Sequence, residues 1–135
     1  MSSYNPDFIL IDDSRLDCFI SQKIISSTCP AASIQSFIDA EDALNFIINR
    51  PPATNSISTI ILLDIQMPVM NGFDFASAFE NLPETVTSQY VIYMVSSSTN
   101  ESDRIRVGNY PCIKHLYNKP LTKNIIQEVI NDLFE

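Results

Sequence analysis

Residues 59–63 read Thr-Ile-Ile-Leu-Leu and are followed directly by Asp64. Positions 60–63 are all aliphatic, so a strand built from them would be apolar on both faces. A run of this kind is typical of a central strand in a parallel sheet that helices cover on both sides. Asp64 would then lie at the carboxyl end of a buried strand, which is where parallel α/β sheets bind their ligands.

Four further runs have the length and composition of strands. They are short and rich in Ile, Val or aromatic residues, and two of them are apolar throughout, like the run that precedes Asp64. These predicted strands cover residues 8–11, 33–37, 90–95 and 112–117.

Amphipathic helical patterns lie between and after the strands. In each, apolar residues three and four positions apart form one stripe, as expected for helices that pack on a sheet. Ser14, Asp39 and Thr122 each stand at the start of a stripe and are predicted N-caps, because their side chains can accept hydrogen bonds from free backbone N–H groups. The predicted helices centre on residues 16–24, 43–48, 75–82, 100–107 and 121–134.

Strands and helices thus alternate, with Pro51-Pro52 and the polar residues after them predicted as a surface loop. This alternation implies right-handed crossovers and a parallel sheet between two helix layers. We therefore predict an α/β fold: a flavodoxin-like, doubly wound (βα)5 three-layer sandwich with a parallel five-stranded sheet in the order 2-1-3-4-5. A chain of 135 residues is too short for an eight-stranded barrel and predicts a single domain over residues 1–135, with its core at about 7–134.

The composition argues against several classes of protein. With 8 basic and 16 acidic residues, the formal net charge is −8, which opposes binding to nucleic acid or to an anionic membrane surface. No apolar run reaches the roughly 18 residues of a membrane span. The first six residues do not resemble a signal peptide, so we expect a cytoplasmic protein. Three cysteines without metal-ligand spacing, one histidine and two glycines argue against a zinc site and against a glycine-rich nucleotide loop.

Polar residues follow four of the predicted strands, and in a parallel sheet these strand ends share one edge. They are Asp12 and Asp13 after the first strand, Asp64 after the third, Ser96 after the fourth and Lys119 after the fifth. Three neighbouring carboxylates repel one another, and Lys119 supplies only one compensating charge. Because the ligands on offer are oxygens, we expect a hard divalent cation, Mg²⁺ or Mn²⁺, to supply the rest. A carboxylate beside such an ion and a lysine is suited to attack a phosphoryl group.

In chain order, these residues resemble the receiver domains of two-component response regulators, of the stand-alone, CheY-like kind. The resemblance extends from about Phe8 to Phe134. Each motif alone is weak, since acids at strand ends commonly cap helices, but their joint placement is specific. The resemblance rests on Asp12-Asp13, Asp64, Met67-Pro68, Asn71-Gly72, Ser96 and Lys119-Pro120.

The resemblance implies a phosphorylation site that depends on Mg²⁺. Asp64 would accept a phosphoryl group from a histidine kinase or a histidine phosphotransfer protein. Asp13 would ligate the metal directly, and Asp12 would hold the ion or one of its waters. Asp64 and the backbone carbonyl of Gln66 would complete the protein ligands.

The resemblance also implies a conformational switch. Lys119 would pair with one phosphoryl oxygen, and Ser96 would move its hydroxyl onto another. Pro120 is expected to follow a cis peptide bond that turns Lys119 inward. Asn71-Gly72 would shape the loop behind the acceptor, with Gly72 free to take a positive φ.

The chain departs from the family at one position of that switch. The family's moving aromatic residue stands three positions before the lysine, where this chain has Leu116, with Tyr117 next to it. Either the aromatic is absent, or Tyr117 replaces it through a shift in register. The positions that tune the phosphoryl lifetime in the family hold Gln66 and Ser98.

Three alternative functions share this topology or this chemistry. A haloacid dehalogenase phosphatase needs a second acid two residues after the nucleophile, and Gln66 cannot donate a proton in that way. A flavodoxin-type electron carrier needs a phosphate-binding loop after the first strand, where Asp12-Asp13 would repel a phosphate. A receiver-like protein-binding module that is not phosphorylated remains the open alternative.

The chain ends with its fifth predicted helix, so we expect its output to be a protein contact or onward transfer of the phosphoryl group, and not an attached DNA-binding or catalytic module. The resemblance places that contact on the fourth helix, the fifth strand and the fifth helix. Phosphorylation would shift the population between two packings of this surface. We therefore predict a signalling switch that catalyses only its own phosphorylation and dephosphorylation.

Overall fold

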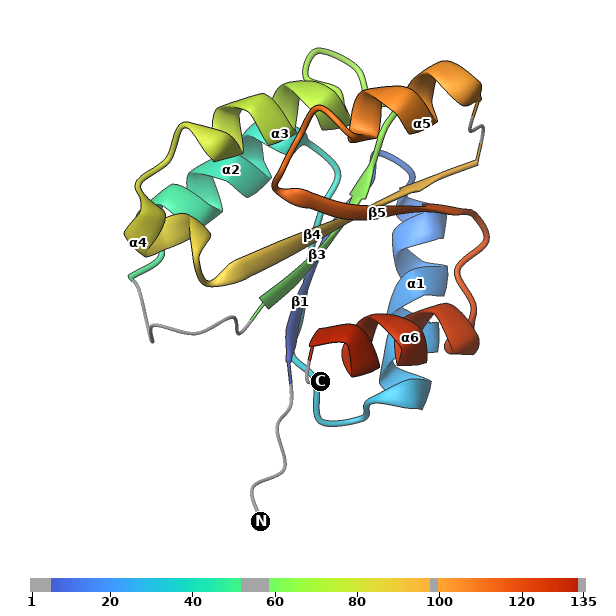
Figure 1. Cartoon of the computed structure of the whole chain (residues 1–135). Coiled ribbons are helices and arrows are strands. Elements are labelled where there is room, and N and C mark those ends of the chain that lie inside the picture. The colour runs from blue at the N-terminus through green and yellow to red at the C-terminus, as the bar shows by residue number, and fades with distance from the viewer. Residues whose placement is uncertain (1–5, 52–58, 98–99, 134–135) are drawn as a thin grey trace.

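The structure is a computed structural model that describes residues 6–51, 59–97 and 100–133. Five parallel strands form one sheet in the order β2-β1-β3-β4-β5, which confirms the predicted topology (Figure 1). The direction of winding reverses between β1 and β3. In folds of this kind, ligands bind at the carboxyl ends of the two strands where this reversal occurs. The strands are β1 (Asp7–Ile11), β2 (Ile34–Phe37), β3 (Thr59–Asp64), β4 (Tyr90–Ser96) and β5 (Ile113–Asn118), each within one residue of its predicted bounds.

The described residues contain five of the predicted helices and one more. The additional helix, α4, is a single turn of four residues after Pro83. It is too short to produce a periodic apolar pattern, so the sequence did not reveal it. The helices are α1 (Arg15–Thr28), α2 (Ala40–Asn49), α3 (Gly72–Glu80), α4 (Glu84–Thr87), α5 (Glu101–Val107) and α6 (Lys123–Leu133).

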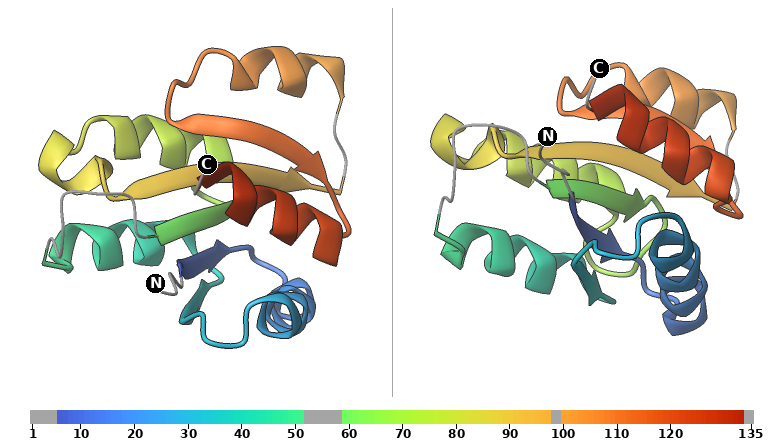
Figure 2. Two further views of the ribbon diagram at one scale, coloured as in Figure 1. Left: turned by 60° about the horizontal axis from the view of Figure 1, so that its bottom comes forward. Right: turned by 90° about the horizontal axis from the view of Figure 1, so that it is seen from below.

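Helices cover both faces of the sheet, with α2, α3 and α5 on one side and α1 and α6 on the other (Figure 2). All six residues of β3 are buried. Ile61 and Leu63 pack in the cluster on the α2–α3 side, while Ile60 and Leu62 pack in the cluster on the α1–α6 side. Burial on both faces is the physical reason that β3 is aliphatic and shows no polar alternation.

The predicted helix caps are present. Ser14 Oγ accepts a hydrogen bond from the Asp17 N–H at 3.1 Å, and Thr122 Oγ1 accepts one from the Ile125 N–H at 3.1 Å. Asp39 accepts hydrogen bonds from the N–H groups of Glu41 and Asp42 in the first turn of α2. Each cap satisfies donors that the helix itself leaves unpaired, which fixes where the helix starts.

Gly72 corrects one expectation. It does not have a positive φ; it is the first residue of α3, and Val69 takes the positive φ, 69°, in the loop before it. Asn71 caps α3 in a full capping box with Asp74, a role that the sequence analysis did not assign. What requires glycine at position 72 is space, because a Cβ there would lie 2.5 Å from the carbonyl oxygen of Asp64.

Some expectations fall outside the described residues: the loop after Pro51, Ser98 and the last apolar residue of the final helix, Phe134. In the parts that the structure does describe, no helix has the length and apolar character needed to cross a membrane.

Candidate functional site

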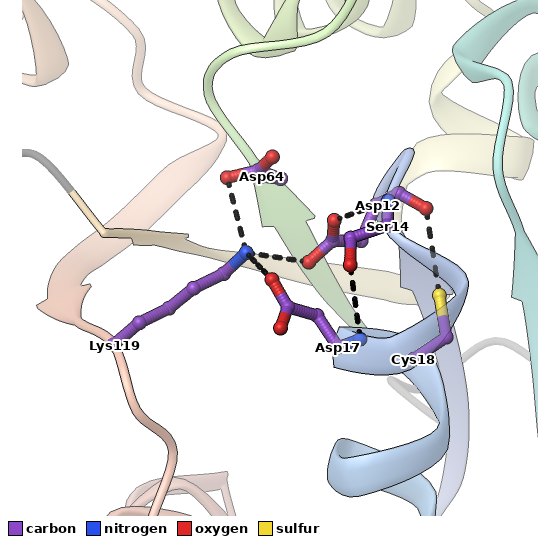
Figure 3. Close-up of polar contacts among 6 residues, drawn as sticks. All are labelled: Asp12, Ser14, Asp17, Cys18, Asp64 and Lys119. Atoms are coloured by element: carbon purple, nitrogen blue, oxygen red, sulfur yellow. Dashed lines mark hydrogen bonds and ion pairs between the residues drawn. The ribbon is translucent and has the colours of Figure 1, made fainter.

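The predicted site residues converge at the carboxyl edge of the sheet. Asp12 follows β1, Asp64 ends β3, Ser96 ends β4 and Lys119 follows β5. Figure 3 shows Asp12 and Asp64 pointing toward the amine of Lys119 from different elements. Asp12, Asp64 and Ser96 are buried, whereas Asp13 is exposed at the rim. The fold therefore brings together residues that are up to 107 positions apart in the chain.

Lys119 is shared among three carboxylates. Its Nζ lies 2.6 Å from Asp12 Oδ2, 2.9 Å from Asp17 Oδ2 and 3.6 Å from Asp64 Oδ1. The first two contacts are hydrogen bonds, while the third is an ion pair without one. The peptide bond between Lys119 and Pro120 is cis, as predicted.

Hydrogen bonds hold both the side chain and the backbone carbonyl of Asp12. Its Oδ1 accepts a hydrogen bond from the Ser14 N–H at 3.0 Å, and its Oδ2 accepts from Lys119. Its backbone carbonyl accepts the thiol of Cys18 at 3.4 Å. Burial raises the pKa of that thiol to about 11, as expected for a cysteine whose role is packing. Asp12 thus presents a carboxylate whose orientation is set before any ligand arrives.

The electrostatics of Asp64 reflect its crowded position. Burial, followed by the charge of Asp12, raises the pKa of Asp64 from its usual 3.8 to about 6, although the charge of Lys119 lowers it. Burial by itself lowers the pKa of Lys119, but its hydrogen bonds to Asp12 and Asp17 and its attraction to Asp64 raise it well above the usual range. At neutral pH the site therefore holds an ammonium beside an excess of carboxylate charge.

The carboxylates suit a hard cation. Asp12, Asp13 and Asp64 each offer an oxygen, and these oxygens lie within 4.8 Å of one another. Asp13 is exposed, so an ion at this place can keep water ligands, as Mg²⁺ does. Gln66, whose backbone carbonyl was the fourth predicted ligand, lines a pocket of about 490 Å³ together with Asp13. The donor set thus fits Mg²⁺ or Mn²⁺ and does not fit a metal that prefers sulfur or nitrogen.

Ser96 lies next to Lys119 through the backbone. Its carbonyl accepts the Lys119 N–H at 2.8 Å, and its neighbour across the sheet is Asn118. The residue is 1% exposed. Ser96 therefore stands at the same sheet edge as Asp64, while the movement of its hydroxyl remains a prediction.

Leu116 and Tyr117 lie on opposite faces of β5. Leu116 is buried in the cluster on the α2–α3 side, opposite Met94 of β4. Tyr117 packs on the α1–α6 side, where its hydroxyl donates to Glu128 of α6 at 3.1 Å and its ring lies 6.1 Å from that of Tyr93. Tyr117 does not occupy the place of Leu116, so the position expected to hold the aromatic residue holds a leucine.

Asp17 belongs to the site although the sequence analysis did not select it. It lies in the first turn of α1 and reaches Lys119 across 102 residues of chain. Its place in the helix turn that directly follows Asp12 and Asp13 was the one signal available.

Comparisons with known proteins identify the family. A family model for the response regulator receiver domain matches residues 8–131. The chain belongs to this family. The receiver is 32% identical to a response regulator receiver protein from Dyadobacter fermentans, with a TM-score of 0.85 over 95% of this chain and 97% of that one. It is 26% identical to a two-component response regulator from Cytophaga hutchinsonii, also with a TM-score of 0.85, over 98% of both chains.

A curated relative of the receiver is named as a stress response regulator. "Stress response regulator protein 1" of Meyerozyma guilliermondii is 26% identical over 98% of this chain. The chain spans only 61% of the length of that relative. Membership of the family makes the chain a receiver domain of the response regulators of two-component signalling.

Proposed function

We propose that this receiver is the phosphoacceptor of a two-component phosphorelay, with Asp64 as the accepting residue. The observation that carries the proposal is the position of Asp64, buried at the end of β3 with Lys119 Nζ 3.6 Å from its Oδ1 and two further carboxylates beside it. Family membership supports the same role. Phosphoryl transfer depends on positioning and on stabilising charge, which is what these side chains offer.

The proposed step is a displacement at phosphorus. A carboxylate oxygen of Asp64 attacks the phosphorus of a phosphohistidine, and the P–N bond breaks with its electron pair leaving on the imidazole nitrogen. The products are an acyl phosphate on Asp64 and the donor's histidine, which regains its proton. Attack of water on the same phosphorus later returns Asp64 and releases inorganic phosphate.

The metal ligands in this proposal are Asp12, Asp13, Asp64 and the backbone carbonyl of Gln66. A bound Mg²⁺ or Mn²⁺ supplies positive charge for the phosphoryl oxygens. The chain's own contribution is to hold Asp12 in a fixed orientation through the Ser14 N–H and the Lys119 ammonium.

The remaining two polar residues would act on the phosphoryl group itself. Lys119 already lies within ion-pair distance of Asp64 and is placed to neutralise one phosphoryl oxygen. Ser96, at the end of the adjacent strand, is proposed to donate its hydroxyl to another. Because Leu116 occupies the position of the family's aromatic residue, the conformational switch is proposed to depend on Ser96 and not on an aromatic ring.

The donor is proposed to be a histidine kinase or a histidine phosphotransfer protein. α1 begins beside the site, and its outer face carries Leu16, Phe19 and Ile20, which are 66%, 56% and 42% exposed. Such a patch next to the acceptor can hold a partner close enough for direct transfer. Output to a protein target is proposed through α5, β5 and α6. The proposed location is the cytoplasm.

The deciding experiment is the intact mass of the protein after incubation with acetyl phosphate and Mg²⁺. We expect a gain of one phosphoryl group that disappears in Asp64→Asn and in the presence of EDTA. A titration with beryllofluoride and Mg²⁺, followed by NMR, covers the case of a short-lived acyl phosphate. If neither reagent acts on the wild-type protein, the chain is a receiver-like binding module that is not phosphorylated.

A further inference from the structure

The contact between Asp17 and Lys119 has no part in the phosphorylation chemistry proposed above. Lys119 Nζ lies 2.9 Å from Asp17 Oδ2 but 3.6 Å from Asp64 Oδ1. An ammonium has three N–H donors, and Asp12 and Asp17 take two of them. The amine is thus held on the α1 side of the site, beyond hydrogen-bond distance of the acceptor (Figure 3).

The Asp17 carboxylate does not complete a capping box at the start of α1, unlike the carboxylate at the same position of α3. In α3, the N3 residue Asp74 accepts from the N–H of its N-cap, Asn71, at 3.1 Å. Asp17 is also the third residue of its helix, and its own N–H is capped by Ser14 at 3.1 Å. The Ser14 N–H, however, donates to Asp12 Oδ1 at 3.0 Å. With that donor taken by Asp12, the carboxylate of Asp17 is turned to Lys119.

Asp17 also stands apart from the cation cluster. Among the described residues, the carboxylates that gather within 4.8 Å of one another are Asp12, Asp13 and Asp64. The Asp17 side chain is 39% exposed, against 10% for Asp12, so it contacts Lys119 from the solvent side. Asp17 therefore competes with Asp64 for the Lys119 ammonium, although it does not belong to the cluster of Asp12, Asp13 and Asp64.

We propose that Asp17 is a positioning residue that restrains the Lys119 ammonium on the α1 side and weakens its pairing with a phosphoryl group on Asp64. The second half of this inference rests on the proposed function. A phosphoryl group brings additional negative oxygens to Asp64, and the hydrogen bonds to Asp12 and Asp17 leave Lys119 one N–H donor for them, on an ammonium that these bonds hold toward α1. For a partly exposed ion pair, the expected effect is about two-fold to five-fold in the affinity for a phosphoryl analogue.

The first test compares beryllofluoride binding in the presence of Mg²⁺ for the wild type, Asp17→Asn and Asp103→Asn. Asp103 lines the pocket beside Asp13 from the α5 side and is not among the carboxylates paired with Lys119, so its variant removes the same charge without touching the ammonium. We expect the dissociation constant to fall about two-fold to five-fold in Asp17→Asn and to change less in Asp103→Asn. An unchanged constant in Asp17→Asn, or equal changes in both variants, would overturn the proposal.

The second test needs neither metal nor phosphoryl analogue. The lysine ammonium signals are recorded by ¹H–¹⁵N NMR on the metal-free protein, with Lys119 assigned by its loss in Lys119→Arg. We expect the Lys119 signal to shift and broaden in Asp17→Asn and to stay in place in Asp103→Asn and in the charge-conserving Asp17→Glu. A Lys119 signal that is unaffected by Asp17→Asn would overturn the restraint. If the wild type fails to bind beryllofluoride, the proposed function fails, but this spectrum still decides whether Asp17 holds Lys119.

Discussion

Gly72 packs directly against the backbone of Asp64. A Cβ at position 72 would stand 2.5 Å from the Asp64 carbonyl oxygen and 3.0 Å from Ile65 Cα. The Gly72 N–H donates to the Ile65 carbonyl at 2.8 Å. The start of α3 therefore packs against the backbone of the proposed phosphoacceptor. This close approach is possible because Gly72 has no side chain.

Gly72→Ala is expected to destabilise the protein by about 1–3 kcal/mol, since the backbone of Asp64 or of α3 must move to make room. Urea unfolding measures this. Gly108→Ala is the matched control, because its φ of −63° suits alanine and the nearest atom to its Cβ would be 3.3 Å away. The control is expected to change stability by less than about 1 kcal/mol. Equal losses in the two variants would contradict the steric explanation.

Asp64→Asn is expected to stabilise the metal-free protein at pH 7.5. The folded-state pKa of Asp64 is about 6 against a usual 3.8, so between these values the folded protein binds more protons than the unfolded chain. The contribution of Asp64 to stability thus falls as pH rises from about 4 to about 6, and it stays lost above that range. Removing the charge should recover about 1–3 kcal/mol at pH 7.5.

The pH dependence is the check on this interpretation. Urea unfolding across pH 4 to 8 should show the advantage of Asp64→Asn shrinking toward zero at the acidic end, where the wild-type carboxyl is protonated. A constant advantage across this range would mean that the gain comes from something other than the ionisation of Asp64.

Mg²⁺ is expected to raise the melting temperature of the wild-type protein, because the carboxylate cluster proposed to bind it exists only in the folded chain. At a hundred-fold excess over the dissociation constant, the gain is about 2.7 kcal/mol. Asp13→Asn should lose most of this gain, whereas Glu41→Gln, on the exposed side of α2, should keep it. Thermal unfolding with and without Mg²⁺ measures both, and equal gains in the two variants would exclude Asp13 as a ligand.

Tyr93→Phe is expected to cost about 1–3 kcal/mol. The Tyr93 hydroxyl donates to Asp132 Oδ2 at 2.7 Å, and the residue is 1% exposed. A part-buried hydrogen bond to a charged acceptor is worth more than an exposed one. Tyr117→Phe removes the analogous bond to Glu128 at 3.1 Å, which is exposed, and should cost less than about 1 kcal/mol. Urea unfolding compares the two, and a larger loss in Tyr117→Phe would contradict this ranking.

Much of the fold could be predicted because the responsible signals are local. The aliphatic run at 60–63 indicates a strand buried on both faces, and the stripes at helical spacing indicate the surrounding helices. Once the strands are known to be parallel, Asp12, Asp64 and Lys119 must share one edge of the sheet. The sequence therefore determined the topology and most of the residues at the proposed site, but not Asp17.

Only the tertiary structure decided how those residues divide their contacts. Asp17 meets Lys119 across 102 residues because Asp12 has taken the N–H that a capping box would offer. The register of β5 on β4 shifts near Tyr93 and sets which face receives Leu116 and which receives Tyr117. The contact of Asp17 with Lys119 and the facing of Leu116 and Tyr117 depend on distances of a few ångströms between segments far apart in the chain. The local periodicity of the sequence does not predict such distances.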